Sequence, residues 1–299
     1  MADSPAAEIR IDEALVRALL RDQAPGWAEH PLVLAAEGWD NAIWRLGDDL
    51  AVRLPRRTAA ADLIRHEQEH LPAIAVRLAA EGIRVPAPLF CGAPGPRFGW
   101  AWSVVPWFEG DSALAQPRAE RSTWAARLAA GLRALHRPAT EGFPVNPVRG
   151  VPLASRDPDM RAVAAVLSRR DPGLGDALLT LWTAGVNAPA HTGPALWLHG
   201  DLHAGNIIVQ AGDLGAVVDF GDTTAGDPAY DLGAAWIVFD PVGRAAFRAG
   251  LAGAYDDATW IRARGWAAAM AMILLTRSDD RPDMATLGAE TAEQLVLPR

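Results

Sequence analysis

The residues best able to do chemistry together lie in one short stretch, from His199 to Asp219. Within it, Asp201 is followed by Asn206, and Asp219 stands further along the chain. A carboxylate can orient an attacking hydroxyl group and accept its proton, and carboxylate and amide oxygens are ligands that Mg²⁺ prefers. This set suits transfer of a phosphoryl group, a reaction that asks a protein mainly for positioning and charge stabilisation.

The spacing of these residues supports the same chemistry. The order Asp-x-x-x-x-Asn, followed by Asp219-Phe220-Gly221, matches the catalytic loop and metal-binding motif of kinases. Two apolar runs, 206–210 and 216–220, predict a hairpin that begins at Asn206. Such a hairpin would return the chain so that Asp219 faces Asp201 and Asn206.

The same stretch also contains residue types that bind zinc. His199, Asp201 and His203 could form part of a zinc hydrolase site, because histidines four residues apart on a helix bind zinc. Gly200 and Gly205 disfavour a helix there, so the kinase interpretation is preferred.

The elements that must position these residues fall into two groups. Strands are expected at 32–36, 42–46, 50–54 and 101–108, with helices at 12–22 and 59–80. Beyond residue 112 the pattern is mostly helical, at 119–136, 159–184, 229–239, 243–255 and 258–276. We therefore expect an α+β fold with a small β-rich N-lobe, 1–106, and a larger, mainly helical C-lobe, 107–299.

The amino-acid composition limits which classes of binding partner and which cellular compartment are expected. The 299 residues carry a net charge of −8, which argues against nucleic acid as a partner. All 28 basic residues are arginine, so any cation that contacts phosphate must be an arginine. No apolar run is long enough for a membrane span, so no membrane partner is expected. The single cysteine, Cys91, is expected to be a buried, inert thiol in a cytoplasmic protein.

The motif continues beyond the hairpin in a recognisable way. The run from His199 to Asn206 reads His-Gly-Asp-Leu-His-Ala-Gly-Asn, and Asp219-Phe220-Gly221 is followed by Asp222 and by a Gly-Asp-Pro-Ala-Tyr-Asp-Leu run at 226–232. These residues resemble the aminoglycoside phosphotransferase family, the antibiotic-kinase relatives of protein kinases. The match is dense over 198–236 and looser over 37–110. The resemblance implies a bilobal, protein-kinase-like fold.

The resemblance also implies roles for single residues of the C-lobe. Asp201 is similar to the catalytic base, and Asn206 and Asp219 to the metal ligands. His199 belongs to the catalytic motif, where it is expected to support the loop. Asp231 would hydrogen-bond the backbone of that loop, and Asp227 is expected to cap a helix rather than to bind a ligand.

In the N-lobe the resemblance implies a cation on a strand that pairs with a glutamate on a helix and grips the phosphates. Arg53 occupies this place where the family usually has lysine, with Glu67 as the expected partner and Glu69 as the alternative. Residues 104–107 look like the hinge that binds adenine, which makes Val105 and Trp107 nucleotide-binding candidates. No Gly-x-Gly-x-x-Gly loop is present, and residues 38–41 stand in its place.

The resemblance implies Mg²⁺ as cofactor, ATP or GTP as donor, and a small-molecule hydroxyl as acceptor. The acidic balance favours an aminoglycoside or another cationic antibiotic, while a macrolide or an ordinary metabolite remains an alternative. Asp222 and Trp236 are candidates for contact with the acceptor, and the acidic run 279–283 is expected to be a solvated loop. The substitution of arginine for lysine at position 53 keeps a second class open, a nucleotide-binding pseudokinase or regulatory module. The sequence indicates no oligomeric state.

Overall fold

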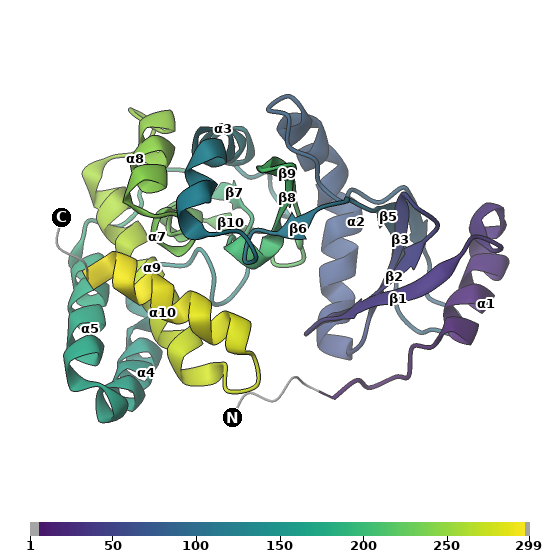
Figure 1. Ribbon diagram of the computed structural model, residues 1–299, viewed down its shortest axis with the longest axis horizontal. Coiled ribbons are helices and arrows are strands. Elements are labelled where there is room, and N and C mark those ends of the chain that lie inside the picture. The colour runs from purple at the N-terminus through teal and green to yellow at the C-terminus, as the bar shows by residue number, and fades with distance from the viewer. Residues whose placement is uncertain (1–5, 297–299) are drawn as a thin grey trace.

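The computed structural model describes residues 6–296, which form two lobes lying side by side (Figure 1). The smaller lobe, on the right of Figure 1, contains the N-terminal sheet, and the larger lobe is mostly helical. The expected bilobal α+β fold is therefore confirmed.

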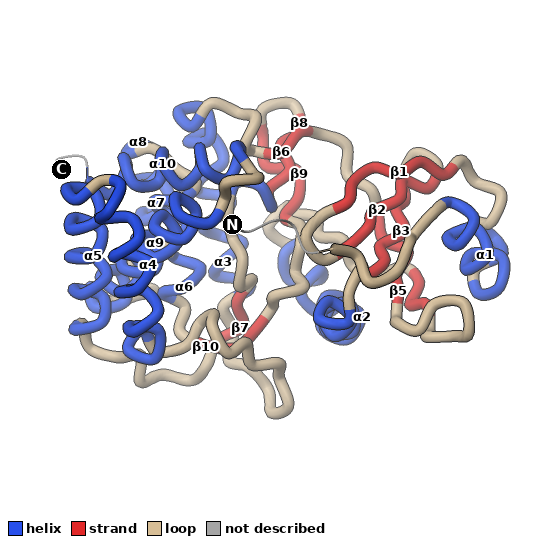
Figure 2. The backbone as a smooth tube through the Cα atoms, turned by 90° about the horizontal axis from the view of Figure 1, so that it is seen from below, coloured by secondary structure: helices blue, strands red, loops and turns tan. Residues whose placement is uncertain are grey.

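The small lobe is built on a five-stranded antiparallel sheet with the strand order β1-β2-β3-β5-β4. The sheet lies between helices α1 and α2 (Figures 1 and 2). Gly47, with φ +62°, allows the tight connection between β2 and β3. The elements of this lobe are α1 (Glu13–Gln23), η1 (Pro25–Trp27), β1 (Leu32–Glu37), β2 (Asn41–Leu46), β3 (Leu50–Pro55), α2 (Thr58–Ala79), β4 (Phe90–Gly92) and β5 (Trp102–Pro106).

Helix α2 connects the cores of the two lobes. Its C-terminal half buries Leu71, Ile74 and Leu78 in the apolar core of the large lobe. A separate core in the small lobe joins α1 to the sheet and includes Leu20 and Trp102. The core of the large lobe therefore draws on residues that precede position 106.

The expectation for Cys91 was wrong, because its side chain is exposed. Cys91 is the middle residue of β4, a strand at the edge of the sheet. Its neighbours Phe90 and Gly92 both lie against the indole of Trp102. Since successive side chains of a strand point to opposite faces, the thiol points away from that core.

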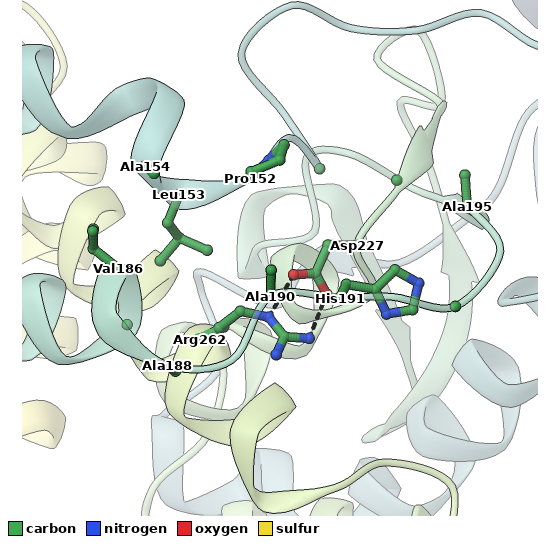
Figure 3. Close-up of a pocket in the computed structure, with 14 residues that line it drawn as sticks. Pro152, Leu153, Ala154, Val186, Ala188, Ala190, His191, Ala195, Asp227 and Arg262 are labelled. Atoms are coloured by element: carbon green, nitrogen blue, oxygen red, sulfur yellow. Dashed lines mark hydrogen bonds and ion pairs between the residues drawn. The ribbon is translucent and has the colours of Figure 1, made fainter.

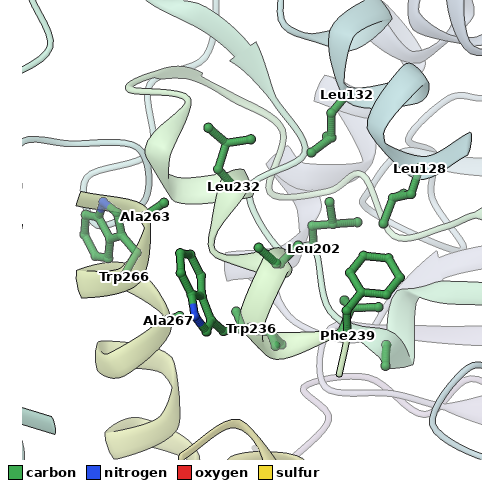
Figure 4. Packing of buried hydrophobic residues seen from close by; sticks show 14 of the residues in the cluster. Leu128, Leu132, Leu202, Leu232, Trp236, Phe239, Ala263, Trp266 and Ala267 are labelled. Atoms are coloured by element: carbon green, nitrogen blue, oxygen red, sulfur yellow. The ribbon is translucent and has the colours of Figure 1, made fainter. Parts of the chain in front are cut away.

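Helix α9 is central to the large lobe and packs against α4, α5, α6, α7 and α10, while α3 and α8 pack against each other. Helix α9 is buried around most of its circumference, and Figure 4 shows Trp236 and Trp266 within the same apolar core. The helices of this lobe are α3 (Ala125–Leu135), α4 (Asp157–Arg170), α5 (Pro172–Asn187), α6 (Ala229–Leu232), α7 (Ala234–Ile237), α8 (Pro241–Gly250), α9 (Asp257–Arg277) and α10 (Pro282–Val296), with short 3₁₀ turns η2 (Arg118–Trp124), η3 (Leu153–Arg156) and η4 (Ala204–Asn206).

Several helices differ from the sequence expectations. The helical pattern expected at 159–184 forms two helices, because Asp171 caps α5 and Pro172 begins it. The first turns of the helix expected at 119–136 are the 3₁₀ turn η2, and the helix expected at 229–239 is divided into α6 and α7. Helix α10 was not expected at all. Its first turn includes Pro282 and Asp283, so the acidic run 279–283 is only partly a loop.

The expected hairpin is present with a tighter turn than the sequence suggested. Strand β8 (Ile207–Gln210) is joined to β9 (Asp213–Val217) by Ala211 and Gly212, with φ of 51° and 81°. Two successive left-handed residues are typical of a type I′ hairpin. The second strand was expected at 216–220, but it ends at Val217, so the residues from 218 onward are outside the ladder.

Four short strands were not expected, and one of them is β4 at the edge of the small sheet. Strand β6 (Asp111–Ser112) adds to the hairpin, and β7 (Leu196–Leu198) pairs with β10 (Thr224–Gly226). The catalytic motif begins directly after β7, and β10 follows Asp222. Among residues 6–296, no helix is long and apolar enough to cross a membrane.

Candidate active site

The loop from His199 to Asn206 is held by buried hydrogen bonds beneath it. His199 Nδ1 accepts the backbone N–H of Asp201 at 3.1 Å, and Nε2 is 3.0 Å from the carbonyl of Val218. This pattern assigns the proton to Nε2, which donates to Val218. Burial lowers the pKa of His199 despite nearby carboxylates, so the ring is neutral. Both ring nitrogens are used, which leaves neither free to bind zinc and fits the expected supporting role.

Asp231 supports the same loop from α6. Its carboxylate accepts the backbone N–H groups of His199 at 2.7 Å and Gly200 at 3.0 Å, and it lies 3.1 Å from Nε2 of His136. Burial raises the pKa of Asp231, but the hydrogen bond and charge of His136 outweigh it and leave the pKa below its usual value. The sequence predicted the bonds to the loop, whereas His136 gave no sequence signal.

Gly200 allows the loop to pass close to the chain at Asp222. Its φ is +84°, and a Cβ at this position would lie 2.2 Å from the carbonyl oxygen of Asp222. Only glycine satisfies both constraints without strain. The close approach brings the two carboxylates of Asp201 and Asp222 to one place.

The carboxylate of Asp201 faces a cation that the sequence did not indicate. Arg149 Nη1 lies 2.5 Å from Oδ1 of Asp201, and Arg149 Nη2 lies 2.9 Å from Oδ2 of Asp222. Burial acts to raise the pKa of Asp201, but Arg149 and His203 outweigh it and hold the pKa well below its usual range. Asp201 is therefore a carboxylate, which can accept a hydrogen bond from a hydroxyl group.

Asn206 and Asp219 are brought together at the base of the hairpin. The carbonyl of Asn206 accepts the backbone N–H of Val218 at 2.9 Å, and its Nδ2 donates to the carbonyl of Asp201 at 2.9 Å. The amide nitrogen is thus used, and Oδ1 of Asn206 is the atom left for a cation. Asp219 has φ +63°, a conformation that a residue other than glycine rarely adopts and that often marks a functional site.

These two residues fit a magnesium ion by their donor atoms. Both line the same cavity, and the carboxylate of Asp219 is 51% exposed. Mg²⁺ usually takes one or two protein oxygens together with phosphate and water. No group of three or more histidine, cysteine or acidic side chains within residues 6–296 is arranged to hold a metal alone. The donor set therefore suits a metal that arrives with a phosphate ligand.

The cavity lies between the small sheet and the hairpin and has a volume of about 440 Å³. Arg53 forms its cationic wall, with Nη1 2.7 Å from Oε1 of Glu67 and Nη2 2.6 Å from Oδ1 of Asp219. With its carboxamide oxygen turned toward Arg53, Asn41 accepts from Nε at 3.2 Å and Nη2 at 3.0 Å. Burial raises the pKa of Glu67 to about 7 against the attraction of Arg53. The geometry selects Glu67 over Glu69 as the partner of Arg53.

The expected hinge residues line the same cavity. Val105 and Trp107 both border it, as do residues 38–41, which stand where a glycine-rich loop would lie. Pro106 has no N–H group, and the N–H of Trp107 already donates to the carbonyl of Asp49 at 2.7 Å. A base in this cavity could therefore meet the backbone of Trp107 only through its carbonyl.

The two candidates for acceptor contact lie in different places. Asp222 is beside Asp201, and burial raises its pKa to about 6 although Arg149 opposes the shift. Trp236 instead borders a wide groove of about 850 Å³ with Trp260, Arg244 and Arg248. None of the proposed catalytic or metal-binding residues borders that groove. The structure brings Asp222, but not Trp236, to the catalytic loop.

Another cavity, of about 200 Å³, is lined by Leu153, Val186 and Arg262 among others and is shown in Figure 3. Its polar feature is a buried ion pair in which Arg262 contacts Asp227 at 2.6 and 3.1 Å. Asp227 also accepts the N–H of Ala229, the first residue of α6, at 3.0 Å, but Pro228 and not Asp227 occupies the N-cap position expected for Asp227. Because Arg262 and Asp227 pair with each other, neither offers an unpaired charge to a ligand in this cavity.

The comparisons with known proteins agree with this architecture. A model of the phosphotransferase enzyme family matches residues 32–267. The chain resembles the GDP complex of wild-type aminoglycoside 2′-phosphotransferase-IIIa, with a TM-score of 0.73, 18% identity, and coverage of 95% of this chain and 98% of that one. It also resembles a macrolide 2′-phosphotransferase from Brachybacterium faecium, with a TM-score of 0.60, 20% identity, and coverage of 96% and 98%. A related GDP and kanamycin complex gives a TM-score of 0.68 at 17% identity, with coverage of 94% and 97%. No curated protein matches the sequence.

Proposed function

Because the chain belongs to the phosphotransferase enzyme family, we propose that it transfers the γ-phosphate of ATP or GTP, with Mg²⁺, to a hydroxyl group of a small molecule. One observation carries this proposal. Arg53, Asn206 and Asp219 border a single cavity between the lobes, and Asn206 is hydrogen-bonded to Asp201. A cation for the phosphates, two oxygen ligands and a carboxylate for the hydroxyl are the parts that phosphoryl transfer requires.

In this proposal each side chain has one task. Arg53 holds the phosphates of the donor through its planar guanidinium, which suits phosphate as well as carboxylate. Asp201 orients the acceptor hydroxyl and accepts its proton as the oxygen forms a bond to the γ-phosphorus, while the bond from that phosphorus to the bridging oxygen breaks and the nucleoside diphosphate leaves. Asn206 and Asp219 would hold Mg²⁺, which would neutralise negative charge on the phosphates. His199 and Asp231 keep the loop in place beneath these groups.

The acceptor that we propose is an antibiotic bearing a free hydroxyl group. One of the similar structures is an aminoglycoside phosphotransferase, a second is a complex with GDP and kanamycin, and a third is a macrolide phosphotransferase. The net charge of −8 favours a cationic acceptor such as an aminoglycoside. The apolar, tryptophan-rich sequence of the large lobe keeps a macrolide as the alternative acceptor. We propose a cytoplasmic site of action, where nucleoside triphosphates are available.

The experiment that tests this function is a phosphorylation screen. Purified protein is incubated with Mg²⁺ and either ATP or GTP, together with aminoglycosides, macrolides, tuberactinomycin-type peptides and amino sugars. Transfer of labelled γ-phosphate to one acceptor class supports the proposal. Nucleotide binding with neither acceptor phosphorylation nor Mg²⁺-dependent hydrolysis would instead indicate a pseudokinase or regulatory module.

A further inference from the structure

The guanidinium group of Arg149 joins the loop of Asp201 to the segment of Asp222. Nη1 lies 2.5 Å from Oδ1 of Asp201 and donates to the carbonyl of Gly200 at 2.6 Å. Nη2 lies 2.9 Å from Oδ2 of Asp222. Its side chain is 22% exposed, so these contacts are largely shielded from solvent. Lysine could not make this set of contacts, because an ammonium is a point charge and not a planar fork.

The backbone of Arg149 is fixed by Asn146, which also contacts the carboxylate of Asp222. Oδ1 of Asn146 accepts the N–H of Val148 at 2.9 Å and the N–H of Arg149 at 3.2 Å. Nδ2 of Asn146 donates to Oδ1 of Asp222 at 3.1 Å. Both oxygens of Asp222 therefore have partners: Oδ2 contacts Arg149 and Oδ1 accepts from Asn146.

The end of this segment is packed against β10 with almost no space between the backbones. Gly150 has φ +66°, and its carbonyl accepts the N–H of Asp227 at 2.9 Å. A Cβ on Gly226 would lie 2.2 Å from the carbonyl oxygen of Gly150, and a Cβ on Gly150 would lie 2.5 Å from Cδ1 of Leu198. This packing fixes the position from which the side chain of Arg149 extends.

The contacts leave Asp201 with two unequal oxygens. Oδ1 is bound by Arg149. Oδ2 lies 3.4 Å from Nδ2 of Asn206 and 3.6 Å from Nε2 of His203, both longer than the contact to Arg149. Rotation of the carboxylate is thus restricted, and Oδ2 is the oxygen left to meet an acceptor hydroxyl.

We infer that Arg149 is a positioning residue that fixes the carboxylate of Asp201 so that Oδ2 faces the acceptor, with Asp222 and Asn146 holding Arg149 in place. This inference rests on the proposed phosphotransfer function. It assigns Asp222 a different task from the one expected from the sequence, since its oxygens hold Arg149 and Asn146. The effect of Arg149 should be on turnover, because it does not border the nucleotide cavity.

The test compares Arg149→Met, Arg149→Lys, Asp222→Asn and the double variant Arg149→Met/Asp222→Asn in Mg²⁺-dependent turnover of ATP, with water or an identified acceptor. We expect Arg149→Met to lower kcat by about 100-fold, the cost of a misplaced reacting group, with the KM for ATP unchanged within about twofold. Arg149→Lys should be intermediate, because it keeps the charge and loses the fork. Added guanidinium, well below unfolding concentrations, should restore part of the kcat of Arg149→Met and none of that of Arg149→Lys.

The double variant separates positioning through Asp222 from a general loss of structure. If Asp222 acts by holding Arg149, Asp222→Asn lowers kcat in the wild-type background but changes it little once Arg149 is methionine. Arg161→Met is the matched control, since Arg161 pairs with Asp157 on the surface of α4. Thermal unfolding shows whether each variant is folded. If Arg149→Met does not fold, the comparison is made with Arg149→Lys instead.

Two outcomes would overturn the assignment. One is a folded Arg149→Met or Arg149→Lys variant with wild-type kcat, and the other is additive losses in the double variant. An inactive wild-type protein would contradict the proposed function itself, which distinguishes that failure from failure of the role of Arg149.

Discussion

Arg53 and Glu67 form a buried ion pair in which Nη1 of the arginine lies 2.7 Å from Oε1 of the glutamate. The pair joins β3 to α2 and directs the other terminal nitrogen of Arg53 to Asp219, 2.6 Å away. Arginine can make both contacts from one planar group, whereas lysine presents a single ammonium. The arginine at position 53 is thus compatible with the cation role usually played by lysine.

Substitution of this arginine should separate charge from geometry. Arg53→Lys should raise the KM for the nucleotide about tenfold, the cost of one charge-assisted hydrogen bond. Arg53→Met should in addition lower the free energy of unfolding, because it leaves Glu67 buried without its partner. Nucleotide titrations and urea unfolding measure the two effects. An Arg53→Lys variant with unchanged KM would show that the fork is not used for the donor.

Removal of the carboxylate of Asp201 should abolish most of the turnover while the nucleotide still binds. Asp201→Asn should lower kcat by about 10² to 10⁴-fold, the usual contribution of a general base. Asparagine keeps an oxygen toward Arg149 and so disturbs the loop less than alanine would. Steady-state kinetics together with calorimetric binding of ATP test this expectation. Near wild-type turnover in the variant would contradict the assignment of Asp201 as the general base.

Activity should depend on a divalent cation held at the base of the hairpin. A chelator should stop turnover and added Mg²⁺ should restore it, and Asp219→Ala should raise the Mg²⁺ concentration needed for half-maximal rate. Asp213→Ala is a suitable control, because Asp213 lies at the other end of the same hairpin and outside the cavity. If both variants show the same Mg²⁺ dependence as wild type, Asp219 does not bind the metal.

The raised pKa of Asp222 predicts how stability changes with pH. The side chain of Asp222 has a pKa of about 6 in the folded protein, whereas its ordinary value, taken for the unfolded chain, is 3.8. Between these values the folded state binds more protons, so this group's contribution to the free energy of unfolding falls as pH rises, by at most about 3 kcal/mol. Urea unfolding of wild type and Asp222→Asn from pH 4 to 7 measures the difference. A wild-type protein that gains stability relative to the variant over this range would contradict the sign.

Replacement of the buried histidine should cost both stability and turnover. His199→Phe keeps a ring but leaves the N–H of Asp201 and the carbonyl of Val218 without their partners. Each unsatisfied buried group costs about 1 to 3 kcal/mol, so unfolding should occur at clearly lower urea concentration. His30→Ala, at an exposed position, provides the comparison. Equal stability of His199→Phe and wild type would show that the ring only fills space.

The sequence was sufficient for the parts of the site that are local. The proposed catalytic base, the proposed metal ligands and the supporting histidine lie within one stretch, and a hairpin of two strands brings Asp219 back to Asn206. Cysteine exposure and the length of the second strand were predicted wrongly. Both depend on which face of a strand is covered and on where a turn closes, and these are tertiary facts.

The sequence by itself thus determined the reaction class, because the spacing of Asp201, Asn206 and Asp219 requires little more than a loop and a hairpin. The partnership of Asp201 with Arg149 was decided only by the tertiary structure. Arg149 lies in a segment without regular structure, 52 residues before Asp201, and no periodicity marks it. Its place is set by the packing of Gly150 against Gly226 of β10 and by the bond of Asn146 to Asp222, contacts between segments that lie far apart in the sequence.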